Sequence, residues 1–129
     1  MLQHFIDQIS MGLALGQPLE PNQEGAYILS LDSDLQIEIR ENEEGNVSLY
    51  SVLVPLLEEG LEELYLRLMS ANLLGRETGG AVLGIDKEKK QVILKTFFPD
   101  EVTYREFYEG LEDFANYAES WREETTEKK

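Results

Sequence analysis

A helical pattern with two apolar stripes, between residues 61 and 73, constrains the fold of this chain most strongly. A helix that packs on one sheet needs only one apolar stripe. At about 100° per residue, the first stripe consists of Leu61, Leu64, Tyr65, Leu68 and Ala71. The second stripe consists of Leu66, Met69 and Leu73, about a quarter to a third of a turn away. The second stripe therefore predicts a second covering surface.

The free energy at stake in the second stripe is large. Burial of one Leu or Met side chain contributes ~1.5–3 kcal/mol, so leaving Leu66, Met69 and Leu73 in water forfeits on the order of 5–9 kcal/mol. That is comparable to the whole stability of a small domain. In a chain this short we expect a second copy of the same helix as the cover, which makes these three residues the predicted homodimer interface. The alternative is that Leu66 and Met69 pack under a loop of the same chain.

The remaining patterns predict an α+β domain in the order α-β-β-β-α-β-β-α, with three helices and antiparallel strands. Residues 2–13 repeat their apolar side chains at helical spacing, and Thr103 and Glu106 form a capping box before a long aromatic stripe. Strand patterns cover residues 26–31, 35–40, 47–54, 81–85 and 91–98. We expect Gly75 to end the central helix, a single domain over residues 1–122, and a frayed charged tail over residues 123–129.

Composition excludes several classes of partner. The 129 residues include 11 basic and 26 acidic side chains, and 11 − 26 gives a net charge of −15. A field of this sign repels nucleic acid and anionic membrane surfaces, whereas it is compatible with a basic protein partner. No cysteine is present, and no apolar run approaches the ~20 residues of a membrane span. The chain start does not have the pattern of a signal peptide, so we expect a cytoplasmic protein.

Residues with catalytic or metal-binding chemistry are scarce. The single histidine, His4, lies on the polar face of the first helix, and no Cys–His pair or serine triad can be proposed. The loop from Gly75 to Gly80 lacks the Gly-Lys-Ser/Thr ending of a phosphate-binding loop, and its Glu77 would repel phosphate. The acidic runs lack the spacing of a calcium loop. We therefore expect no catalytic residues, no metal and no cofactor, and a protein that is not an enzyme.

Three stretches of the sequence resemble class I chaperones of type III secretion, the Tir-chaperone-like family. They are the opening amphipathic helix with L-G-Q-P-L-E-P-N-Q-E-G-A, the segment L-M-S-A-N-L-L-G-R-E-T-G-G-A-V-L-G-I-D, and the closing L-E-D-F-A-N-Y-A-E-S-W-R. The order of elements and the acidity agree with this resemblance, which covers nearly the whole chain. It implies a homodimeric chaperone in the cytoplasm of a Gram-negative bacterium. Such a chaperone binds the N-terminal segment of a secreted virulence effector, keeps it non-globular and delivers it to the export apparatus.

The resemblance also implies surface grooves for the apolar side chains of the effector, and strand addition at a sheet edge. We expect the first helix and the first three strands to form such a groove. The residues predicted to bind the effector are Leu2, Phe5, Ile6, Ile28, Ile37 and Leu49. The alternative is that all six belong to the core. Further partners implied by the family are the secretion ATPase or a regulatory protein, and the alternative function is a regulator on the same scaffold that contacts a transcription component.

Overall fold

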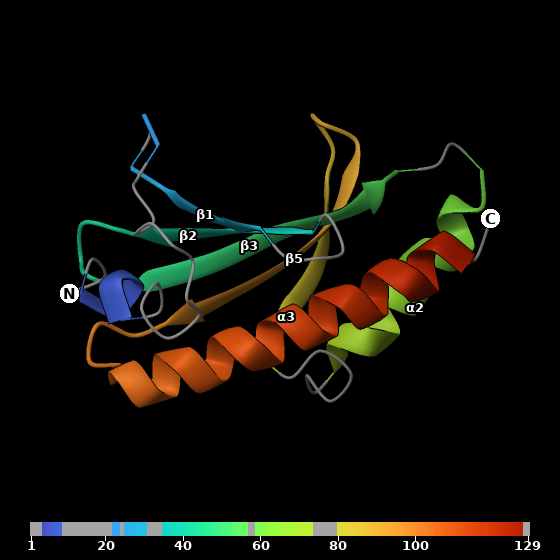
Figure 1. Cartoon of the computed structure of the whole chain (residues 1–129). Helices are drawn as coiled ribbons and strands as arrows, with labels where there is room; N and C mark the ends of the chain where they lie inside the picture. Colours follow the sequence, from blue (N-terminus) through green and yellow to red (C-terminus); the bar gives the residue numbers. More distant parts are fainter. Residues whose placement is uncertain are drawn as a thin grey trace.

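The computed structural model describes residues 4–8, 22–23, 25–30, 35–56, 59–73 and 80–127. Within them, a five-stranded antiparallel sheet has the strand order β1-β2-β3-β5-β4 (Figure 1). The strands are β1 (Tyr27–Ser30), β2 (Gln36–Glu41), β3 (Val47–Pro55), β4 (Val82–Asp86) and β5 (Gln91–Phe98). Two long helices, α2 (Leu61–Asn72) and α3 (Tyr104–Glu127), and a helical segment at residues 4–8 complete the fold. The predicted α+β architecture and the order of its elements are confirmed.

Alternating side chains give the sheet one apolar face, and tight turns set its register. Ile37 and Ile39 of β2 and Leu49 of β3 are fully buried, whereas their chain neighbours are at least partly accessible. In the β2–β3 turn, Asn42 Oδ1 accepts hydrogen bonds from the Glu44 and Asn46 N–H groups, both at 2.9 Å. This local bonding fixes the hairpin in which Ile39 lies opposite Leu49.

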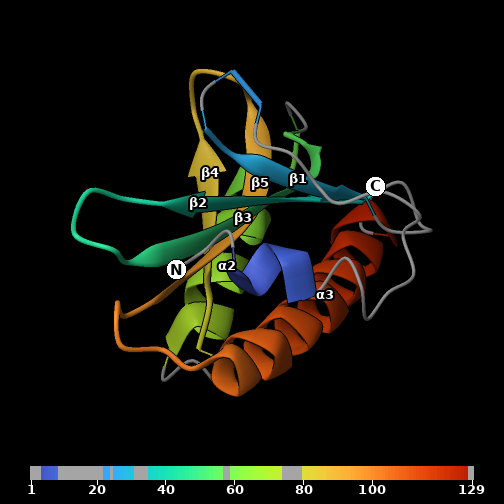
Figure 2. The ribbon, with the colours of Figure 1, turned by 60° about the vertical axis from the view of Figure 1, so that its left-hand side comes forward.

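Helix α3 and the segment at residues 4–8 cover this apolar face on the same side of the sheet (Figure 2). The Phe5 ring stacks on Phe107 of α3, with centroids 5.2 Å apart. The capping box begins the helix as predicted, since Thr103 Oγ1 accepts from the Glu106 N–H at 3.1 Å and Glu106 Oε1 accepts from the Thr103 N–H at 3.0 Å. The predicted aromatic stripe of α3 therefore packs against the apolar face of the sheet and forms one side of the core.

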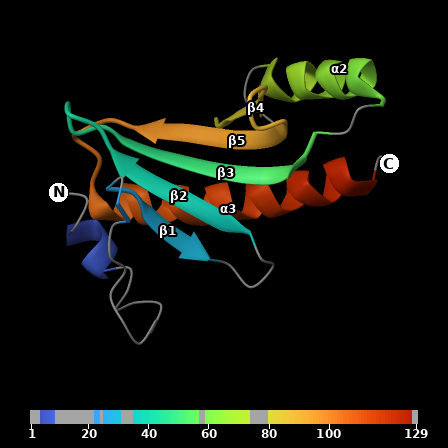
Figure 3. The ribbon, with the colours of Figure 1, turned by 90° about the horizontal axis from the view of Figure 1, so that it is seen from above.

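Helix α2 lies at the other end of the sheet, beside β4 (Figure 3). Leu68 and Ala71 are its buried residues. The carboxamide of Asn72 fixes the helix to the strand, because its Nδ2 donates to the Leu83 carbonyl and its Oδ1 accepts from the Leu83 N–H, both at 2.8 Å. One buried side of α2 therefore faces the sheet, and its opposite side faces outward.

The structure defines where the two helices α2 and α3 end. Helix α2 ends at Asn72, and the extended backbone of Leu73 forms its C-cap; Gly75, the predicted end of the helix, lies outside the described residues. Helix α3 continues through the predicted frayed tail to Glu127. Within this extension Thr125 is buried, and its hydroxyl donates to the Trp121 carbonyl at 2.7 Å. Residues 9–13 of the predicted first helix lie outside the described residues.

Candidate functional site

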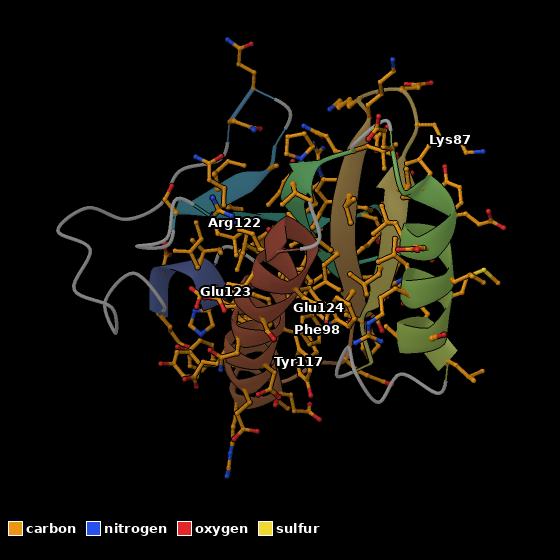
Figure 4. The ribbon with its side chains drawn as sticks, turned by 90° about the vertical axis from the view of Figure 1, so that its right-hand side faces the viewer. Lys87, Phe98, Tyr117, Arg122, Glu123 and Glu124 are labelled. Carbon is orange, nitrogen blue, oxygen red and sulfur yellow. The ribbon has the colours of Figure 1, made fainter. Side chains whose placement is uncertain are left out.

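The first exposed surface is an apolar patch on the outer side of α2. Figure 4 shows α2 at one side of the molecule, with side chains that project away from the sheet and from α3. The exposed fractions are 41% for Tyr65, 60% for Leu66, 69% for Met69 and 70% for Leu73. We call these four residues the α2 patch. Leu66, Met69 and Leu73 are the predicted dimer residues, and they lie on one exposed helix face; Tyr65, predicted on the buried face, borders them.

The second exposed surface is the face of the sheet opposite α3, which no helix covers in the described part of the chain (Figures 1 and 2). A depression of about 290 Å³ lies on this face, between strands β1, β2 and β3. Its lining residues are Ile28, Gln36, Glu38, Tyr50 and Val52. The β4–β5 turn rises on the same side and partly encloses the face (Figure 1). We call this surface the open sheet face.

Polar and charged side chains on the open sheet face interact with neighbouring side chains. Arg40 Nε donates to the Glu38 carboxylate. Burial raises the pKa of the Tyr50 hydroxyl, and the negative charges of Asp86 and Glu38 and a hydrogen bond to Asp86 raise it further. Lys95 Nζ lies 4.9 Å from the centre of the Phe97 ring, which is 61% exposed. The face therefore combines accessible apolar side chains with fixed polar groups, a combination suited to binding a polypeptide.

The structure does not bring the six predicted effector-binding residues together on one surface. Phe5, Ile6, Ile37 and Leu49 are at most 5% exposed and belong to the core between the sheet and α3, as in the alternative interpretation. Ile28 lies on the open sheet face, and Leu2 lies outside the described residues.

Four lining residues of the depression are absent from the groove predicted from the sequence: Gln36, Glu38, Tyr50 and Val52. The strand alternation contains the signal that finds them, because each occupies a position between the buried residues of β2 or β3. The predicted groove instead contains the most apolar positions of these strands, such as Ile37 and Leu49. In a sheet with one covered face, those positions face the core.

The described residues offer little for catalysis or metal binding. His4 is exposed. Within the same described segments, no group of three or more His, Cys, Asp or Glu side chains is placed to hold a metal ion. None of the helices in these segments is long and apolar enough to cross a membrane.

Comparison with known proteins identifies relatives over nearly the full length. The sequence profile of the Tir chaperone protein (CesT) family matches residues 4–122. A protein of Chlamydia pneumoniae is 33% identical over 122 residues, which cover 94% of this chain and 93% of that protein.

Several solved structures share the fold. The ExsC–ExsE complex matches with a TM-score of 0.78 and 20% identity, over 95% of this chain and 91% of the matched chain. The HopA1–SchA chaperone–effector complex matches with a TM-score of 0.74 and 17% identity, over 95% and 93%. The Yersinia pestis type III secretion chaperone SycH, in complex with a stable fragment of YscM2, matches with a TM-score of 0.69 and 15% identity, over 93% and 98%.

Proposed function

Because the chain belongs to the Tir chaperone protein (CesT) family of class I type III secretion chaperones, we propose that it handles a secreted effector. It binds the N-terminal segment of that effector, keeps the segment non-globular and secretion-competent, and delivers it to the export apparatus. It acts in the cytoplasm of a Gram-negative bacterium, as a binding protein without catalytic activity. The secretion ATPase is the proposed partner at delivery.

The observation that carries this proposal is the open sheet face. Ile28 and Val52 line a depression that remains accessible, although most apolar side chains on the other face of the same sheet are buried. An extended or helical client segment gains free energy by burying these side chains, at about 25 cal/mol per Å² of apolar surface. Ordering the segment costs about 2–5 kcal/mol, so the client needs a large apolar footprint. The HopA1–SchA structure is a chaperone–effector complex with the same fold, which supports a polypeptide client.

Purification of the tagged chain from its host, followed by mass spectrometry, tests the function. We expect the N-terminal segment of one or more secreted proteins to co-purify. A Val52→Lys variant, which places a charge in the depression, should retain at least tenfold less of this segment. Ser120→Lys is the matched control, because Ser120 is an exposed residue on α3, and it should retain the wild-type amount.

Two outcomes contradict the proposal. One is a folded wild-type chain that enriches no secreted polypeptide, and the other is equal retention by folded Val52→Lys. If the chain enriches a transcription component in place of a secreted protein, the regulatory alternative replaces the export function.

The proposed chaperone is a homodimer that buries the α2 patch. Leu66, Met69 and Leu73 are each at least 60% exposed in the single chain, which is the exposed stripe that the dimer hypothesis requires. Sedimentation of Met69→Glu tests the contact, because a carboxylate in an apolar interface has no partner. We expect wild type to sediment as a dimer and the variant as a monomer, with Ser120→Glu as the control of equal charge. A monomeric wild type, or an unchanged mass for Met69→Glu, excludes this interface.

A further inference from the structure

The two edges of the sheet differ in the backbone groups that they offer to another strand. In an antiparallel strand, successive residues direct their N–H and C=O groups to alternate sides. Leu83 directs both groups away from β5, because both bond to Asn72. By alternation, Ile85 is the other residue of β4 whose backbone faces outward.

The β1 edge can be assigned in the same way. The Ala26 N–H donates to Asn22 Oδ1 at 3.0 Å, and the Ala26 carbonyl accepts from the Asn22 N–H at 2.8 Å, so Ala26 faces away from β2. Ile28 and Ser30 therefore face outward along β1. The same result follows from the pairing registers. When the alternation of inward and outward backbone groups is followed from β4 through β5, β3 and β2 to β1, Ile28 and Ser30 again face outward.

We propose that Asn72 closes the β4 edge to strand addition, so that an extended polypeptide does not pair with that edge. This inference deepens the proposed function, since it specifies where an extended client cannot bind. A strand that adds to β4 needs the Leu83 N–H and C=O groups, and Asn72 holds both. On β4, Ile85 is then the one residue whose outward backbone groups are not bonded to Asn72, and it lies next to the turn. On β1, the backbone groups of Ile28 and Ser30 both face outward.

The carboxamide of Asn72 is chemically suited to this role. A primary amide presents one acceptor and a donor side by side, as a peptide group of a neighbouring strand does. Aspartate at this position lacks the donor, and alanine lacks both groups. Helix α2, which packs beside β4, brings the carboxamide to the strand edge. The β4 edge therefore has a helix packed beside it, and its Leu83 N–H and C=O groups are hydrogen-bonded; both features oppose edge-to-edge association.

Amide hydrogen exchange and sedimentation of Asn72→Ala test this inference without any client. We expect the Leu83 amide to exchange about five- to tenfold faster than in wild type, the effect of losing one hydrogen bond, while the Leu94 amide is unchanged. We also expect Asn72→Ala to form concentration-dependent species larger than those of wild type. Addition of Ile85→Pro, which removes the outward N–H of β4, should restore the wild-type size. Ser70→Ala is the matched control on the same helix, with exchange and size unchanged.

If Leu83 exchange rises but the size distribution does not change, Asn72 only docks α2 and the edge-closing role is refuted. Unchanged Leu83 exchange refutes the role too. If Asn72→Ala does not fold, Asn72→Ser supplies the same readouts, because its short side chain does not span both Leu83 groups. The experiment needs no effector, so a failed capture of secreted protein leaves its outcome interpretable.

Discussion

Arg67 of α2 and Glu124 of α3 form a two-point ion pair between helices that are far apart in the sequence. Arg67 Nε lies 3.0 Å from Glu124 Oε2, and Arg67 Nη2 lies 3.0 Å from Oε1. The Arg67 guanidinium also lies 4.7 Å from the centre of the Trp121 ring. This contact joins the C-terminal part of α3 to α2, and it helps to set the orientation in which α2 presents the α2 patch.

Removal of the charge in this pair should destabilise the fold measurably. We expect Glu124→Gln to lower the free energy of unfolding by about 1 kcal/mol, because the pair is bidentate but partly exposed. Arg67→Lys should lose a similar amount, since lysine does not form the two-point contact. Urea unfolding checks both. The exposed pair Arg105–Glu109 supplies the control, since Glu109→Gln should change stability by less than about 0.5 kcal/mol. If the two pairs lose the same free energy of unfolding, the Arg67–Glu124 pair contributes no more to stability than an exposed pair.

Gly110, in the N-terminal part of α3, should not tolerate alanine. A Cβ atom at this position would lie 2.5 Å from the Phe98 ring, which packs edge-on against Phe107. Alanine is favoured over glycine in a helix by about 1 kcal/mol. We nevertheless expect a net loss of about 1–2 kcal/mol from overpacking, measured by urea unfolding. Phe98→Leu in the Gly110→Ala background should recover part of that loss; a stabilised Gly110→Ala variant contradicts the contact.

The capping box should support the start of α3. Thr103→Ala removes the hydroxyl that accepts the Glu106 N–H, and we expect a loss of about 1 kcal/mol. Thermal unfolding at neutral pH measures it, with Ser120→Ala as an exposed control within the same helix. A variant as stable as wild type would mean that water replaces the cap at no cost.

Glu106 makes part of this cap dependent on pH. Hydrogen bonds from the Thr103 backbone and side chain lower the pKa of Glu106 below its ordinary value of 4.5. Because the folded-state pKa is below the unfolded one, the contribution to stability is present above the unfolded pKa and disappears as pH falls through the folded pKa. We expect wild type to be more stable than Glu106→Gln at pH 7, and we expect this difference to shrink as the pH falls through the folded-state pKa. A difference that stays constant on acidification would contradict this linkage.

Phe5 should behave as a core residue. Its ring lies 5.2 Å from Phe107 and 5.8 Å from Tyr104, centre to centre, and it is only 5% exposed. We expect Phe5→Ala to cost about 3–5 kcal/mol in chemical unfolding. Phe97→Ala is the matched control, because its ring is 61% exposed, and it should cost less than about 1 kcal/mol. Similar losses for the two variants would contradict the packing of residues 4–8.

Local patterns in the sequence predicted much of the fold. The strand pattern of residues 35–40 predicted β2, and the Thr103–Glu106 spacing predicted the start of α3, because each depends on neighbours along the chain. The exposed stripe of Leu66, Met69 and Leu73 followed from helical geometry alone. The structure confirms these secondary-structure elements and the exposure of the stripe, whereas the subunit contact remains a prediction.

Contacts between distant segments were not predictable in the same way. Strand alternation does not tell which face a helix covers, so Ile37 and Leu49 were assigned to a groove although they lie in the core. The Arg67–Glu124 pair and the Asn72–Leu83 bonds depend on how α2 docks, which no local spacing encodes. The role of Gly110 became clear only from the position of Phe98, which the strand order of the sheet determines.

The length of α3 has a mechanical consequence. Phe107 and Trp121 are fourteen residues apart, which corresponds to about 21 Å along a straight helix. Near its N-terminal end, α3 contacts Phe5 through Phe107. Near its C-terminal end, it contacts Arg67 through Trp121 and Glu124. We therefore expect a change in the tilt of α3 to alter the contacts with Phe5 and with Arg67 together.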